Sequence, residues 1–408
     1  MEQESAQAQQ VRPFRMFIAY ASGAYGFSFA TTMAFLVPLR ALELGASPAF
    51  IGLILTAAAA VSAFTSISAG DLANRIGPRQ SYILGTLISA VIALFFALTT
   101  NLWVMLALQL VLGPARTLAW ISSQTYITGI GTAQQRTSIA AKFSFSTQVG
   151  VMTAPIIAGV AASTLGYQAS FLFAAGLAAT FTVMGIIIPN IRSKSASGLQ
   201  KQASTGGFRE ALELVRLRGI QVALLLTSIR VWTTSGWNSF VVILLVQKGV
   251  SETLAGTVVS SWAIVAMIST ISAGWVVRLG SKEIITAFTL GLGALGVAIT
   301  PHVAFFPLMY LPALLIGIGQ GLSLPLLLAM MGDWAPADKR GVALGIRVSV
   351  NQSAASLSPF SMGNLINLSG NSAGFGFSGI FMGIVLATAT LLHIGHRRQI
   401  VRDSTPAG

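Results

Sequence analysis

Residues 143–191 read FSFSTQVGVMTAPIIAGVAASTLGYQASFLFAAGLAATFTVMGIIIPNI, a run of 49 residues without Asp, Glu, Lys or Arg. A membrane-spanning helix needs about 20 consecutive, mostly apolar residues. A run of this length therefore fits two spans and the turn that joins them. The run breaks near its middle at Ser163-Thr164-Leu165-Gly166, where we expect that turn.

The same pattern recurs along the chain. Residues 284–332 and 348–396 are uncharged over 49 residues each, and they break at Thr300-Pro301-His302 and between Asn367 and Asn371. Shorter apolar runs each fit one span. These runs are 16–39, 44–70, 80–100, about 103–130, about 219–246 and 253–277. We therefore predict an all-α membrane protein with twelve transmembrane helices.

The composition excludes an ordinary soluble protein. Only 9% of the 408 residues are charged, 54% are hydrophobic, and the mean hydropathy is +0.77. Soluble domains carry roughly a quarter charged residues. Cysteine is absent, which excludes disulfides and thiolate metal sites.

The net charge of +13 follows membrane topology and does not indicate nucleic-acid binding. Most Lys and Arg gather in segments that lie on one side if the N-terminus is inside, as the positive-inside rule requires. The first ten residues, MEQESAQAQQ, lack the basic flank of a signal peptide, so we interpret them as a cytoplasmic tail. The expected location is the cell membrane, with both termini cytoplasmic.

An internal repeat relates the two halves of the chain at an offset of 204 residues. Gly113 matches Gly317 and Pro155 matches Pro359, and further pairs agree. The repeat predicts two pseudo-symmetric six-helix bundles, at 1–189 and 219–408. Residues 190–218 form the only long polar segment, a cytoplasmic linker in which 208–217 has helical spacing and could lie along the membrane surface.

The segment GDLANRIGPR, residues 70–79, resembles the signature loop of the major facilitator superfamily, usually written G-x-L-a-D-R-x-G-r-R. A degenerate copy lies at 274–282. The resemblance implies the fold of that family and a latch at the cytoplasmic helix ends. Asn74 stands where the family usually has an acid, so it cannot form that ion pair. The expected gating residues in this loop are Gly70, Asp71, Asn74, Arg75, Gly77 and Arg79.

The fifth predicted span carries a second resemblance around Pro155. Residues 150–159 are similar to the family's G-x-x-x-G-P-x-x-G-G motif, which is associated with exporters and antiporters, although two glycines are replaced by alanine. Proline removes a backbone hydrogen bond and small residues allow close packing. We expect Pro155 and its twin Pro359 to bend their helices and to contribute to gating.

Three arginines lie within predicted spans that contain no acidic residue. Arg116 is near the centre of the fourth span and Arg230 near the centre of the seventh. An Arg at the centre of a membrane helix costs about 2.5–3.5 kcal/mol on insertion scales, so neither is expected to face lipid. Their partners must be dipoles, water or a ligand, and a network that only fixes packing is as good an interpretation as substrate contact. Arg347 lies about two turns into its span and could snorkel to the interface.

Polar and aromatic side chains accompany these arginines at helical spacing. In the family that the loop resembles, the first, fourth, seventh and tenth spans line a central cavity. That resemblance implies a substrate site, although packing explains any single aromatic residue equally well. The expected substrate-binding residues are Arg116, Arg230, Trp120, Gln124, Gln320, Trp237, Asn238, Tyr20 and Tyr25.

We predict a secondary transporter that moves a small organic solute by alternating access. The arginines favour an anionic solute, because their forked donors match carboxylates and phosphates. An efflux pump for amphiphilic drugs or metabolites is an alternative, as is a non-transporting membrane receptor. We expect no enzyme, because no nucleophile, base and acid gather. The GLGALG sequence at 291–296 follows no predicted strand, so no cofactor is expected. The expected partners are the solute and the lipid bilayer, with no nucleic acid, and the expected state is a monomer.

Overall fold

The computed structural model describes residues 13–128, 136–187, 208–336 and 340–404. Every long element is helical, as the sequence predicts. The helices of the first half are α2 (Pro13–Glu43), α3 (Pro48–Ile76), α4 (Pro78–Leu98), α5 (Leu102–Thr128) and α6 (Arg136–Ile187). Those of the second half are α8 (Phe208–Val215), α9 (Arg218–Gln247), α10 (Glu252–Val276), α11 (Lys282–Ile299), α12 (Tyr310–Trp334) and α13 (Arg340–Ser404), with 3-10 turns η1 (Val277–Leu279), η2 (Thr300–His302) and η3 (Phe306–Met309).

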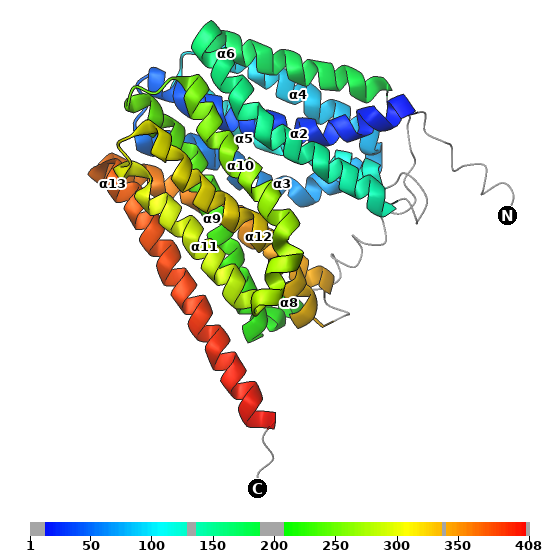
Figure 1. Cartoon of the computed structure of the whole chain (residues 1–408). Coiled ribbons are helices and arrows are strands. Elements are labelled where there is room, and N and C mark those ends of the chain that lie inside the picture. The colour runs from blue at the N-terminus through cyan, green and yellow to red at the C-terminus, as the bar shows by residue number, and fades with distance from the viewer. Residues whose placement is uncertain (1–12, 129–135, 188–207, 337–339, 405–408) are drawn as a thin grey trace, which may run out of the picture. The chain divides into compact units, whose positions relative to one another are not determined.

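The predicted breaks in the long apolar runs are confirmed. Gly166 interrupts α6 with φ 77°, and Gly370 interrupts α13 with φ 81°, so each consists of two helices joined at a glycine. Figure 1 shows α6 turning back on itself. The third run breaks at Thr300–His302, which forms η2 between α11 and α12. Positive φ strains any residue with a side chain, and this explains why glycine stands at both turns.

Nine helical stretches in the described part of the chain are long and apolar enough to cross a membrane. Two of them contain the turns at Gly166 and Gly370, and α2 is not among the nine. The chain is therefore a multi-pass helical membrane protein, and the count of twelve spans stays a prediction.

Two compact units divide the chain. Unit 1 comprises Met1–Ala46, Ala57–Leu199 and Ser251–Ser260, and unit 2 comprises Ser47–Thr56, Gln200–Val250 and Ser261–Gly408. The first turns of α3 thus pack with the second half of the sequence, and the first turns of α10 pack with the first half. The predicted linker at 190–218 contains the boundary at Leu199, although most of it lies outside the described residues.

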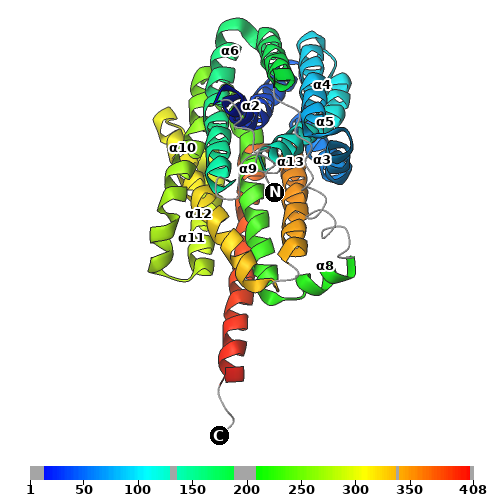
Figure 2. The ribbon, with the colours of Figure 1, turned by 90° about the vertical axis from the view of Figure 1, so that its right-hand side faces the viewer.

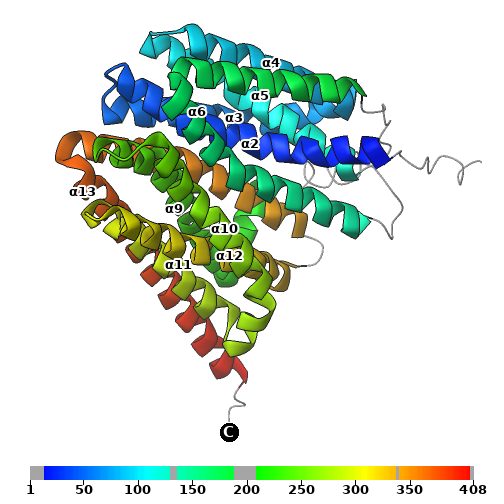
Figure 3. The same cartoon turned by 45° about the horizontal axis from the view of Figure 1, so that its top comes forward.

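Within unit 1, α6 packs along α2 and α4. Figure 3 shows α4 beside the second part of α6. Buried residues from α2, α5 and α6 form one apolar cluster, which consists of Ile18, Ala19, Tyr126, Ile127, Ile139 and Phe143. This packing fixes α5, which carries Arg116.

Within unit 2, α9 packs along α13, and α11 packs against both α12 and α13. The sequence predicts a helix at 208–217, and α8 is that helix, lying crosswise to α9 in Figure 2. Lys248 follows α9, and its Nζ donates to the carbonyl oxygens of Pro301 at 3.0 Å and Val303 at 2.6 Å. Burial lowers the pKa of Lys248.

The repeat predicted from sequence recurs in the contacts. A side chain at Gly113 would overlap the carbonyl oxygen of Ala58, and one at Gly317 would overlap that of Trp262. Gly317 and Trp262 each lie 204 residues after their counterparts Gly113 and Ala58. Gly45 and Gly249, also 204 residues apart, share φ values of 80° and 79°. The repeat therefore extends to individual helix crossings.

Candidate functional site

In unit 1, Arg116 lies on α5, which packs against α2, the helix that carries Tyr25. Tyr25 is buried among Phe29, Phe181 and Tyr82. The Nε of Arg116 is buried and has no hydrogen-bond partner among the described residues. The structure thus leaves a buried guanidinium donor of Arg116 without an acceptor among the described residues.

Trp120, one turn after Arg116, packs against its neighbours. Its ring meets Phe27 edge-on at 4.8 Å and stacks on Phe143 at 5.8 Å, and a side chain at Gly26 would press on it. Tyr20 is partly buried and packs against the apolar cluster of unit 1. Gln124 is exposed. Trp120 and Gln124 follow Arg116 on α5 at successive intervals of four residues, so the three share one face of that helix.

In unit 2, Arg230 lies in the middle of α9. Its carbonyl oxygen accepts a hydrogen bond of 2.8 Å from Nε2 of Gln320 on α12. The side chain of Gln320 is only 3% exposed. Gln320 and Arg230 were both expected at the site, and the structure joins them. The Nε of Arg230 is buried without a partner within the part of the chain that the structure describes.

Arg347 lies on α13, the helix that packs along α9. Its own Nε is also buried, and no described residue accepts from it. The residue as a whole is only partly buried, and the snorkelling position suggested by the sequence stays a prediction.

Two amide side chains add polar atoms on the same helices. Asn238 lies two turns after Arg230 on α9, and Asn351 lies one turn after Arg347 on α13, so each shares a face with its arginine. The Oδ1 of each is buried without a partner among the described residues. Asn238 was expected at the site. Asn351 was missed, although its spacing of four residues from Arg347 was a usable signal.

Trp237 has a packing role. It is 1% exposed, and its Nε1 donates to Oγ1 of Thr300 at 3.0 Å. Trp232 is similarly buried and donates to Oγ of Ser378 at 2.8 Å. Since the indole of Trp237 is enclosed and its donor satisfied, we build the site of unit 2 without it.

The signature loop ties two helices of unit 1 together. Gly77 precedes α4 with φ 91°, which requires glycine. Arg79 donates from Nε to the carbonyl oxygen of Gly185 at 3.3 Å and from a terminal nitrogen to that of Ile186, both in the last turn of α6. Cations stabilise helix C-termini in this way. Gly70 is buried, Asp71 and Arg75 are exposed, and the side chain of Asn74 lies outside the described residues.

The two expected hinge prolines lie at close helix crossings. In unit 1 a side chain at Gly256 of α10 would overlap the carbonyl oxygen of Pro155. In unit 2 a side chain at Gly52 of α3 would overlap the carbonyl oxygen of Pro359. Both pairs are again related by 204 residues. Pro155 thus lies at a close crossing with the first turns of α10, and Pro359 at a close crossing with the first turns of α3.

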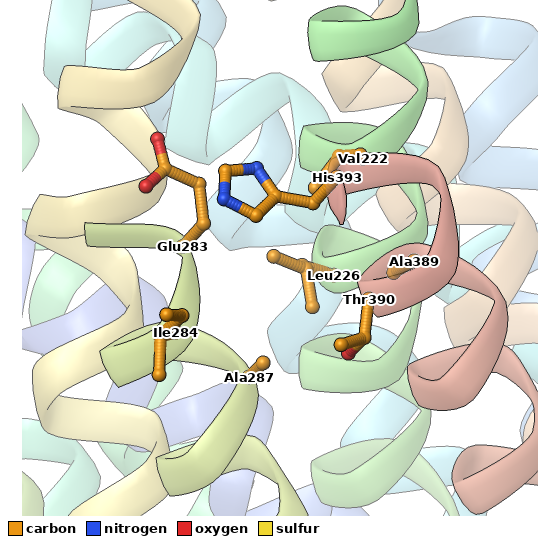
Figure 4. Close-up of a pocket in the computed structure, with 8 residues that line it drawn as sticks. All are labelled: Val222, Leu226, Glu283, Ile284, Ala287, Ala389, Thr390 and His393. Carbon is orange, nitrogen blue, oxygen red and sulfur yellow. The ribbon is translucent and has the colours of Figure 1, made fainter. Parts of the chain in front are cut away.

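A separate half-open pocket lies between α9, α11 and α13, with about 230 Å³ of empty space that includes open solvent. Figure 4 shows the ring of His393 extending toward the side chain of Glu283, whose carboxylate points away from the ring. Its other lining residues are Val222, Leu226, Ile284, Ala287, Ala389 and Thr390. Within the described chain, no group of three His, Asp or Glu side chains could hold a metal ion.

Comparison with known proteins decides the family. The model of the Major Facilitator Superfamily matches residues 17–310 and 237–406. The chain belongs to the major facilitator superfamily. The proteins of this family are transporters and not enzymes.

Solved structures of this superfamily share the fold. The nucleoside transporter NupG superimposes with a TM-score of 0.79 at 12% identity, covering 93% of this chain and 99% of that one. A bacterial homologue of the human lysosomal transporter Spinster, inward-facing and unoccupied, gives a TM-score of 0.77 at 15% identity, covering 97% and 100%.

One curated relative aligns over a short region. It is the "Probable anion transporter 4, chloroplastic" of Arabidopsis thaliana, 28% identical over 130 residues. The match covers 31% of this chain and spans only 23% of that protein.

Proposed function

We propose that this transporter carries a small organic anion across the cell membrane by alternating access. The observation that carries the proposal is the state of Arg116 and Arg230. Each presents a buried guanidinium nitrogen without an acceptor among the described residues, on a helix with no acidic residue between its ends. An unpaired buried charge is unfavourable, and an anionic ligand would supply the missing acceptor.

Other features support an anion less directly. The apolar runs that form the interior of both units contain no Asp or Glu, so the chain offers the arginines no carboxylate of its own there. The curated relative carries the words anion transporter in its name, although the match is short. The arginines remain the stronger support.

The alternative of an efflux pump for amphiphiles needs an aromatic cavity. Trp237 is enclosed, and Trp120, although partly exposed, meets Phe27 edge-on and stacks on Phe143, so both rings already serve packing. We therefore favour the anion over the amphiphile. A receptor without transport is the third possibility, and measurement of flux separates it from both.

The test compares binding and uptake in purified protein and proteoliposomes. Succinate, monomethyl succinate, inorganic phosphate and glycerol 3-phosphate serve as probes, with thermal shift as the binding readout. We expect Arg116→Gln and Arg230→Gln to weaken binding of the preferred anion roughly 10-fold or more, because hydrogen bonds to charged groups contribute about 1.5–3 kcal/mol. Arg116→Lys and Arg230→Lys keep the charge but lose the fork, and should bind intermediately.

Arg278→Gln is the matched control, because it removes an exposed Arg of η1 outside the site. Unchanged affinity in both folded Arg116→Gln and Arg230→Gln proteins would contradict the proposal. Binding without uptake into proteoliposomes would instead favour the receptor.

A further inference from the structure

The half-open pocket between α9, α11 and α13 has no part in the proposed function. Its floor is apolar and consists of Val222, Leu226, Ile284, Ala287 and Ala389. Its polar atoms come from Glu283, Thr390 and His393 (Figure 4). A concave site with mostly apolar walls and a few polar groups is typical of binding sites for small molecules that have both kinds of surface.

The seam between α11 and α13 leads into this pocket. A Cβ at Gly291 of α11 would lie 3.2 Å from the side chain of Leu386 of α13, so the two helices touch at this level. Ala287 and Thr390, each four residues from that contact, line the pocket instead. The contact between the two helices therefore gives way to open space within about one turn.

The side chains beside the pocket are apolar and exposed. Ile284 and Phe288 of α11 and Leu391 of α13 are among the exposed large hydrophobic residues. Both helices belong to stretches that are long and apolar enough to cross a membrane. Exposed apolar side chains on such helices contact lipid tails, which are as apolar as leucine. The pocket is therefore within reach of a lipid.

Arg218 provides a cation next to the pocket. It is the first residue of α9 and lies one turn before Val222, so the two share a face of that helix. Its Nη1 lies 3.7 Å from the position that a Cβ at Gly395 would occupy, and the guanidinium thus reaches α13 two residues beyond His393. Among the described residues, no carboxylate forms a salt bridge with it. Guanidinium groups bind phosphate through charge-assisted hydrogen bonds, and basic pockets between membrane helices bind lipid headgroups.

Glu283 provides an anion on the opposite wall. It lies in the first turn of α11, and the buried ring of His393 extends toward its side chain while the carboxylate points away from the ring (Figure 4). The neighbouring cation, Lys282, forms its salt bridge with Asp333 of α12 instead. A carboxylate in this position can accept hydrogen bonds from an ammonium group. The pocket thus has a donor for phosphate and an acceptor for an amine.

We propose that this pocket binds an aminophospholipid, with an acyl chain on the apolar floor, the phosphate on Arg218 and the ammonium group on Glu283. The positive-inside rule assigns this end of α9 to the cytoplasm, so the lipid belongs to the cytoplasmic leaflet. A phospholipid without an amine leaves Glu283 without a partner, and a quaternary amine has no N–H group to donate to it. The site is independent of the transported solute, because neither Arg116 nor Arg230 takes part.

The test compares phosphatidylethanolamine with its N-methyl, N,N-dimethyl and N,N,N-trimethyl derivatives and with phosphatidylglycerol, all with the same acyl chains. The methyl series keeps the charge and removes the ammonium N–H donors one at a time. Each lipid is titrated into the purified protein in detergent, and the rise of the thermal midpoint reports its affinity. We expect affinity to fall step by step along the series, by roughly 3- to 10-fold in all. Phosphatidylglycerol should bind more weakly than phosphatidylethanolamine.

Two substitutions localise the site. Glu283→Gln should bring phosphatidylethanolamine and its trimethyl derivative within about twofold of each other, and Asp71→Asn, which changes an exposed acid of unit 1, should keep the difference. Arg218→Gln should weaken the whole series roughly 3- to 10-fold, whereas Arg278→Gln should not.

Three results would overturn the proposal. They are equal affinities along the methyl series, tighter binding of phosphatidylglycerol than of phosphatidylethanolamine, and a folded Glu283→Gln protein that keeps the preference. The first two are measured on the wild-type protein, so they decide the question even where a variant does not fold.

Discussion

At the scale of single residues, the same amino-acid type has different roles in different surroundings. Arg79 is satisfied by two backbone carbonyl oxygens, whereas Arg116 and Arg230 leave buried nitrogens without acceptors. The Nε1 of Trp237 donates a hydrogen bond to Oγ1 of Thr300. Sequence position alone placed Arg230 and Trp237 together at the site, because they lie two turns apart on one helix. Their contacts differ, since the Nε1 of Trp237 donates to Thr300 whereas the Nε of Arg230 has no acceptor among the described residues.

Trp237→Phe tests this distinction. The variant loses the hydrogen bond to Thr300 and part of a buried ring, so we expect it to lower the free energy of unfolding by about 1–3 kcal/mol. Thermal unfolding in detergent measures the loss. Affinity for the preferred anion should stay within about twofold, since the indole is enclosed. A marked loss of affinity in a folded Trp237→Phe protein would restore Trp237 to the site.

At the scale of elements, the sequence predicted what periodicity and length determine. The apolar runs gave the helices, and the breaks at Gly166, Gly370 and Thr300 were found because turn residues interrupt an otherwise continuous run. Contacts across helices were harder to predict. Nothing in the sequence shows that Gln320 donates to the carbonyl oxygen of Arg230, since the hydrogen bond joins residues that are 90 positions apart. The spacing of residues in the sequence predicts which side chains share a face of one helix. Only the packed structure shows which other helix that face contacts.

The end of α6 provides a prediction at this scale. Arg79→Gln removes a cation that donates to the carbonyl oxygens of Gly185 and Ile186, so the junction between α4 and α6 should weaken. We expect a loss of about 1–2 kcal/mol in unfolding free energy, seen as a lower thermal midpoint. Arg75→Gln is the control in the same loop, because Arg75 is exposed. Equal effects of the two substitutions would mean that the loop responds to net charge and not to this contact.

At the scale of the whole molecule, charge asymmetry predicts the orientation that the fold alone leaves open. The basic residues of the 190–218 segment should lie in the cytoplasm, together with both termini. In a chain without native cysteine, Ser197→Cys gives a single label site. We expect it to react with a membrane-impermeant thiol reagent in inside-out vesicles only. Labelling from outside intact cells would invert the topology.

The repeat also predicts which contacts must open during transport. In unit 1 the first turn of α10 is held against α6, where Oγ of Ser163 and Oγ1 of Thr253 are 2.7 Å apart. The Tyr167 hydroxyl donates to Glu252 beside them at 2.9 Å. These contacts join segments from the two sequence repeats, so alternating access by movement of one repeat against the other has to separate them.

A disulfide between Ser163→Cys and Thr253→Cys should therefore stop uptake, and a reductant should restore it. The matched control is Thr86→Cys with Thr182→Cys, whose hydroxyl oxygens are 3.0 Å apart between α4 and α6. That crosslink lies within one repeat and should leave uptake largely unchanged. In both pairs the hydroxyl oxygens are within hydrogen-bond distance, so the two positions are neighbours, and oxidation is checked by loss of free thiol because a disulfide needs a Cβ separation of about 4 Å. The measurement is anion uptake into proteoliposomes before and after oxidation, with the single-cysteine variants alongside. Full uptake by the crosslinked Ser163→Cys and Thr253→Cys protein would show that α10 and α6 stay together through the cycle, and the moving contact would then have to lie elsewhere.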